Sequence, residues 1–71
     1  MGCAIRNRIR ELRTAHNLTQ QALADRVGVT RQTVNAIELG KYSPTLEMAF
    51  RIAAVFGVPL DDVFQFEETV T

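Results

Sequence analysis

Residues 19–40 read TQQALADRVGVTRQTVNAIELG, and this pattern predicts two short helices joined by a tight turn. Apolar residues recur at helical spacing in both halves of the stretch. Thr19 and Thr30 stand where an N-cap hydroxyl would begin each helix. Gly28 lies between the halves, where a residue with positive φ is most easily a glycine. The predicted helices run over residues 20–27 and 31–39.

The second of these helices has an outward face suited to reading DNA bases. Two short helices around a glycine-containing turn can place the second helix in the major groove. Val34 and Ile37 point inward, so the opposite face is open. Arginine can contact guanine, glutamine and asparagine can contact adenine, and a methyl group can pack on thymine. The predicted base-reading residues are Arg31, Gln32, Asn35 and Ala36. A merely solvated helix face is the plain alternative, but the spacing of Ala24 and Gly28 favours DNA.

Further helices are predicted on both sides of this unit. Ile5, Ile9 and Leu12 recur at helical spacing and predict a helix from about Ala4 to about His16. Thr45 caps another predicted helix, which runs to about Phe56 and is broken by Gly57 and Pro59. Its expected buried stripe consists of Leu46, Ala49, Phe50, Ile52, Ala53 and Phe56. A helical turn is expected over Leu60–Val63, and Phe64-Gln65-Phe66 alternates as a strand does.

Length, charge and cysteine content limit the class of protein. The 71 residues with one cysteine, Cys3, make a single small domain without a disulfide, compatible with the cytoplasm. No apolar stretch is long enough to span a bilayer, so no membrane partner is expected. The net charge is zero, but residues 1–41 carry seven basic and three acidic residues, and residues 42–71 carry one and five. Such a dipolar domain can turn its basic part toward phosphates.

Catalytic and metal-binding residues are too few to predict an enzyme. His16 has no second histidine near it in a metal-ligand pattern, and we expect it at the periphery of the fold. Asp61 and Asp62 are adjacent and do not face the same way on a helix, so they predict no cation site. There is no pairing of a nucleophile with a base and no glycine-rich phosphate loop. The sequence therefore predicts no catalytic residues, no metal, no cofactor and no small-molecule ligand.

Several segments together resemble the Cro/CI-type (XRE) helix-turn-helix family. They are LTQQALA (18–24), VGVTRQTV (27–34), Ile37-Glu38, Gly40-Lys41-Tyr42 and PTLE (44–47). The likeness is greatest to short stand-alone members such as the cytolysin-operon repressor. It implies an all-α, five-helix, lambda-repressor-like domain with residues 31–39 as recognition helix. It also implies a homodimer that binds double-stranded operator DNA and represses transcription.

The resemblance also implies roles for individual residues. Gln20 would contact a phosphate, and Arg13 and Glu38 would form an ion pair between the first helix and the recognition helix. Ala36 departs from the longer polar residue of some members, and Leu39 departs from a frequent asparagine. Further contacts to the DNA backbone are expected from Thr30, Thr33, Lys41, Tyr42 and Ser43.

The C-terminal segment is the predicted dimer interface. Val63, Phe64 and Phe66 lie beyond Gly57 and Pro59 and are too apolar for a loose tail. Residues 64–66 would pair with Cys3-Ala4-Ile5, as in the short relatives, and add a two-stranded sheet to the helices. Two-fold symmetry would then set two recognition helices about 34 Å apart on a pseudo-palindromic operator. In the alternative, the phenylalanines only cover the core of their own subunit.

Two other interpretations stay open. An adaptor or antitoxin-like module that binds another protein would share the fold, but it would not need Arg31, Gln32, Lys41 and Tyr42. A DNA-binding module of a longer regulator is the other possibility, and the acidic C-terminal segment argues against it.

Overall fold

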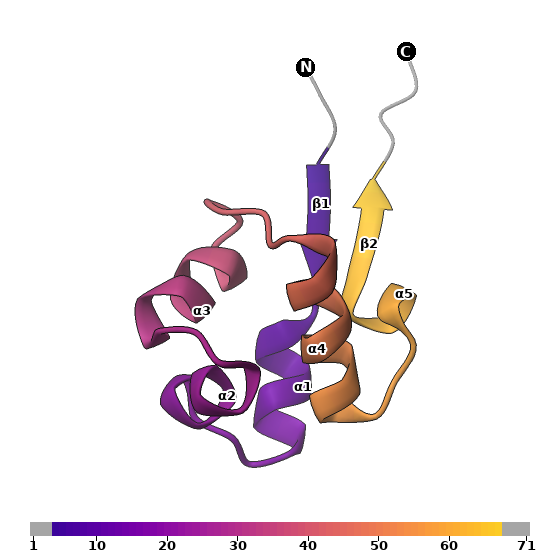
Figure 1. Ribbon diagram of the computed structural model, residues 1–71. Helices are drawn as coiled ribbons and strands as arrows, with labels where there is room; N and C mark the ends of the chain where they lie inside the picture. The colour runs from indigo at the N-terminus through magenta and orange to yellow at the C-terminus, as the bar shows by residue number, and fades with distance from the viewer. Residues whose placement is uncertain (1–3, 68–71) are drawn as a thin grey trace.

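Five helices and a two-stranded sheet make up residues 4–67, the part of the chain that the computed structural model describes (Figure 1). The predicted helical pair is present within one residue of its expected bounds. The elements in chain order are β1 (Ala4–Asn7), α1 (Ile9–Ala15), α2 (Gln20–Val27), α3 (Arg31–Glu38), α4 (Leu46–Phe56), α5 (Leu60–Val63) and β2 (Phe64–Glu67).

The ends of the helices follow the predicted signals. The hydroxyls of Thr19, Thr30 and Thr45 each accept a hydrogen bond from the N–H three residues later, at 3.0, 3.2 and 3.1 Å, which satisfies an N–H group that the helix leaves open. Gly28 follows α2 with a φ of +90°, and a Cβ there would meet nothing within 4 Å. Glycine is therefore favoured at this turn by its backbone conformation and not by lack of space.

The N-terminal segment differs from the predicted helix. α1 begins at Ile9, and residues 4–7 form β1, which pairs antiparallel with β2 so that Ile5 lies opposite Phe66. Asn7 makes the change from strand to helix: its Oδ1 accepts a hydrogen bond from the Ile9 N–H at 3.2 Å. The predicted helix start at Ala4 is wrong. The two terminal segments pair as predicted, but residues 64–66 lie opposite residues 5–7 and not opposite Cys3-Ala4-Ile5. Cys3 lies outside the described residues.

The core is formed by one side of each helix. Leu46 and Phe50, which were expected in the buried stripe of α4, are instead 68% and 54% exposed. The apolar stripe of α4 is wider than the core beneath it, so one edge of the stripe stays in solvent. None of the described helices is long and apolar enough to cross a membrane. The buried core residues are Ile9, Leu23, Ala24, Val27, Val34, Ile37, Ile52, Ala53, Phe56 and Val63.

Candidate nucleic-acid interface

α3 presents the four predicted base-reading residues on one accessible surface. Val34 and Ile37 are buried and fix the rotation of the helix about its axis. Residues four apart lie one above the other on a helix, so Asn35 lies next to Arg31 and Ala36 next to Gln32, in two neighbouring rows. Arg31, Gln32 and Asn35 are exposed and Ala36 is half-buried. The structure therefore brings this set together, away from the core.

The residues expected to contact the DNA backbone flank this surface. Thr30 precedes α3, and Lys41, Tyr42 and Ser43 follow it in an exposed loop. The Lys41 N–H donates to the Ala36 carbonyl at 2.9 Å, which sets the direction in which the loop leaves α3. The hydroxyls of Thr30 and Thr33 share a hydrogen bond of 3.0 Å. Hydroxyl and cationic groups of this kind are the usual partners of phosphate oxygens.

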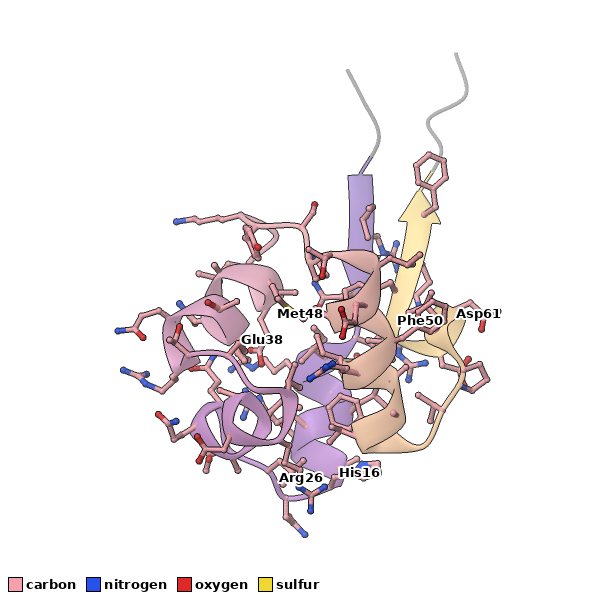
Figure 2. All side chains as sticks on the ribbon, viewed as in Figure 1. His16, Arg26, Glu38, Met48, Phe50 and Asp61 are labelled. Carbon is pink, nitrogen blue, oxygen red and sulfur yellow. The ribbon has the colours of Figure 1, made fainter. Side chains whose placement is uncertain are left out.

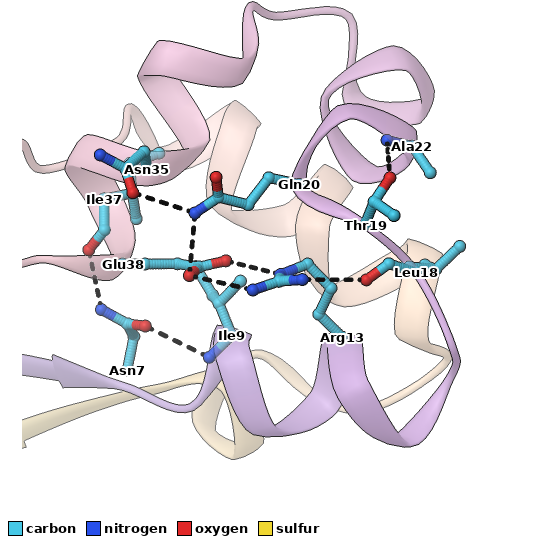
Figure 3. A network of polar contacts seen from close by, with 10 residues as sticks. All are labelled: Asn7, Ile9, Arg13, Leu18, Thr19, Gln20, Ala22, Asn35, Ile37 and Glu38. Carbon is cyan, nitrogen blue, oxygen red and sulfur yellow. Dashed lines mark hydrogen bonds and ion pairs between the residues drawn. The ribbon is translucent and has the colours of Figure 1, made fainter.

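Arg13 and Glu38 form an ion pair beneath this surface (Figure 3). The Arg13 Nε donates to Glu38 Oε2 at 2.8 Å and its Nη2 to Oε1 at 3.4 Å, while Nη1 donates to the Leu18 carbonyl at 3.0 Å. The two side chains are only 16% and 7% exposed. Glu38 is the one acidic residue of α3. Because its carboxylate is turned inward and paired, the exposed side chains of α3 carry no negative charge.

Gln20, the first residue of α2, joins the ion pair to the exposed surface of α3 (Figure 3). Its Nε2 donates to Asn35 Oδ1 at 3.0 Å and to Glu38 Oε1 at 3.3 Å. An amide nitrogen has two N–H groups, so both donors of the Gln20 side chain have partners within the protein. The expected contact between this side chain and a phosphate would have to break one of these bonds.

Asn7 is a positioning residue that the sequence reasoning missed. Its Nδ2 donates to the Ile37 carbonyl at 2.9 Å and so ties the end of β1 to the C-terminal end of α3. Its Oδ1 also accepts from the Ile9 N–H two residues on, which is an Asx-turn, a local signal that asparagine can give in a sequence. The apolar spacing of Ile5, Ile9 and Leu12 concealed it.

The remaining candidates lie away from the surface of α3. His16 is exposed at the end of α1, and its ring lies 5.3 Å from that of Phe56 (Figure 2). Within residues 4–67, no three His, Cys, Asp or Glu side chains gather to hold a metal ion. Of the expected interface residues, Val63 is completely buried in its own core, Phe64 is half-buried and Phe66 is exposed.

A family model described as helix-turn-helix matches residues 9–63, most of the chain. The chain belongs to the Cro/CI-type helix-turn-helix family. As a member of this family it is a DNA-binding regulator of transcription. The match spans all five helices, so the family assignment covers the whole helical part of the fold.

Three relatives show how widely the family occurs. The chain is 50% identical to a protein of Methanocaldococcus jannaschii named uncharacterized HTH-type transcriptional regulator, covering 90% of this chain and 97% of that one. It is 36% identical to the cryptic phage CTXphi transcriptional repressor RstR of Vibrio cholerae, covering 89% and 57%. The crystal structure of the restriction-modification controller protein C.AhdI from Aeromonas hydrophila superposes with a TM-score of 0.71 at 31% identity, covering 76% and 78%. These relatives are named as regulators and not as enzymes.

Proposed function

We propose that the protein is a cytoplasmic repressor that binds a pseudo-palindromic operator as a homodimer, with α3 in the major groove. The observation that supports this most directly is the surface of α3, where Arg31, Gln32 and Asn35 are exposed on a helix anchored from behind by a largely buried ion pair. The Vibrio cholerae relative is named a transcriptional repressor. Repression needs only occupancy of the operator, which a single small domain can provide.

The proposed contacts divide into base reading and backbone binding. Arg31 can make a bidentate contact with guanine O6 and N7, and Gln32 can read adenine. Lys41, Tyr42, Ser43 and the N-cap hydroxyl of Thr30 would bind phosphates on both sides of the groove. Because the side-chain donors of Gln20 are occupied, its phosphate contact is assigned to the main-chain N–H at the start of α2.

An uncovered apolar face supports the proposed dimer. Ile5 and Phe66 are opposite each other in the sheet and therefore lie on the same face of it. At the base of the sheet this face carries Phe64, which packs against the core. The strands extend past the helices (Figure 1), and among residues 4–67 Ile5 and Phe66 at their tip stay 49% and 62% exposed.

α4 continues this apolar face. Leu46 and Phe50 are exposed on α4, and Figure 2 shows Phe50 on the side of α4 that faces away from α3. A hollow of about 290 Å³ is lined by Leu46 of α4, by Ile5, Leu60 and Phe64, and by Ser43 and Pro44 of the loop before α4, so Leu46 and the apolar face of the sheet border the same hollow. A contiguous exposed apolar surface of this kind marks an interface. We assign it to a second copy of the chain, because one recognition helix reads too few bases for selective binding. Phe64 and Phe66 take part, whereas the buried Val63 supports them from behind.

Selection of binding sites from random duplex DNA tests the proposal. We expect an enriched pseudo-palindrome with half-site centres about 10 base pairs apart. Affinity for that site should fall with salt along a log–log slope of about −0.9 per phosphate contact. Enrichment of a single half-site would contradict the dimer, and binding that does not change with salt would contradict the phosphate contacts. Failure to enrich any sequence would favour the adaptor alternative.

A further inference from the structure

The polar network behind α3 has a fixed direction of hydrogen-bond donation. A guanidinium can only donate, so Arg13 obliges Glu38 to accept, and an ionised carboxylate can only accept. Gln20 lies on the other side of that carboxylate and must present its amide nitrogen, not its oxygen, to Glu38 Oε1 at 3.3 Å. The ion pair of Arg13 and Glu38 thus determines the orientation of the Gln20 amide.

The orientation of Gln20 in turn determines that of Asn35. The Gln20 Nε2 offers its other N–H toward α3, and only an acceptor can take it. Asn35 therefore turns its Oδ1 inward, 3.0 Å from Gln20 Nε2. Its Nδ2 points away from Gln20 and carries two N–H donors on the exposed side (Figure 3).

We propose that Gln20 is a specificity-determining residue that acts through Asn35, by making Asn35 present donors and not an acceptor to the base it meets. The inference rests on the proposed contact of α3 with DNA. The usual bidentate contact of asparagine with adenine needs an outward acceptor for N6 and an outward donor for N7. With the oxygen held inward, the best match is guanine, whose edge offers two adjacent acceptors, N7 and O6. Adenine would place its N6 donor against a donor of Asn35.

Four variants test this inference, and one of them, Asn35→Ala, serves only to locate the base pair that Asn35 meets. Gln20→Met keeps an unbranched side chain of similar length but removes the donors. Gln21→Met is the matched control, because Gln21 is the next residue of α2 and its amide bonds to Asp25 at 2.9 Å and not to α3. Asn35→Asp keeps an acceptor for Gln20 and replaces the outward donors by an acceptor. Each protein is titrated with the selected duplex carrying each of the four base pairs at the position where Asn35→Ala abolishes base preference.

We expect the wild type and Gln21→Met to favour guanine over adenine by about fivefold or more, the lower end of what a base contact discriminates. Gln20→Met should bring this ratio to about one or invert it, because the freed amide can turn its oxygen outward. Asn35→Asp should shift the preference toward cytosine, whose N4 is a donor. Thermal melting of each variant without DNA checks that it is folded.

Two results would overturn the inference while leaving the proposed function intact. One is an adenine preference in the wild type. The other is a guanine-to-adenine ratio that stays the same in folded Gln20→Met. If Gln20→Met fails to fold, an unchanged base preference in Asn35→Asp overturns it instead. A wild type that binds no duplex at all would overturn the proposed function and this inference together.

Discussion

At the residue scale, we predict different roles for two cations on the surface proposed to face DNA. Arg31 is exposed within α3, and Lys41 is exposed in the loop beyond it. If Arg31 reads a guanine, Arg31→Ala should cost about 1–3 kcal/mol and relax the preference at one position in each half-site. Lys41→Ala should weaken binding to all sequences about equally and reduce the salt slope by about one. Titrations of matched and single-base-changed duplexes separate the two effects, and a uniform loss for both variants would contradict the assignment of Arg31.

At the scale of the elements, Arg13 of α1 and Gln20 of α2 both bind Glu38 and so fix the position of α3. Glu38→Ala would leave Arg13 without its partner in a largely buried place, and breaking a buried pair costs about 3–5 kcal/mol. The exposed pair of Glu47 and Arg51 has the same distance, 2.8 Å, with side chains 74% and 59% exposed. Glu47→Ala should therefore change stability by about 0.5 kcal/mol or less. Thermal or urea unfolding of both variants measures the contrast, and equal melting temperatures would show that burial of the Arg13 pair adds nothing.

Local signals predicted most of the elements, because each depends on a few neighbouring residues. The threonine caps and Gly28 set the ends of the central helices in the sequence as in the structure. The start of α1 was missed, because the apolar spacing of Ile5 and Ile9 concealed the local signal of Asn7. Ile5 fits a helical period with Ile9, and its place in a strand depends on pairing with Phe66, far away in the chain. The exposure of Phe50 likewise depends on where α4 meets the other helices.

The structure places the predicted base-reading residues on one surface and contains the expected Arg13–Glu38 ion pair, but the bonds that Gln20 makes to Asn35 and Glu38 were not predicted. Residue types and helical spacing were enough to choose Arg31, Gln32 and Asn35. The orientation of Asn35 follows from a chain of donors and acceptors on three helices, and only the folded arrangement brings Arg13, Glu38 and Gln20 into contact. The spacing of residues in the sequence does not indicate which of these groups donates to which.

At the scale of the whole molecule, the apolar face predicts the oligomeric state. Wild type should sediment as a dimer of the 8.0 kDa chain at micromolar concentration. Phe66→Glu should sediment as a monomer, since a charge would be buried in the interface without a partner. Leu39→Glu is the matched control. Leu39 is 59% exposed, close to the 62% of Phe66, but it lies at the end of α3 and outside the proposed interface. A monomeric wild type would contradict the dimer, and a dimeric Phe66→Glu would place the interface elsewhere.

Asn7 links the two-stranded sheet directly to α3, the proposed recognition helix. Its side chain joins the last residue of β1 to the last turn of α3, and the neighbouring Arg8 N–H donates to the Val63 carbonyl at 2.8 Å, just before β2. In the proposed dimer, the strands that meet the partner and the helix that enters the groove would therefore move as one stiff body. In such a dimer the distance and the angle between the two recognition helices would be fixed. One base pair inserted between the half-sites moves them by about 3.4 Å and rotates one about the DNA axis by about 35° relative to the other, and only the DNA would be left to absorb the mismatch by bending or untwisting.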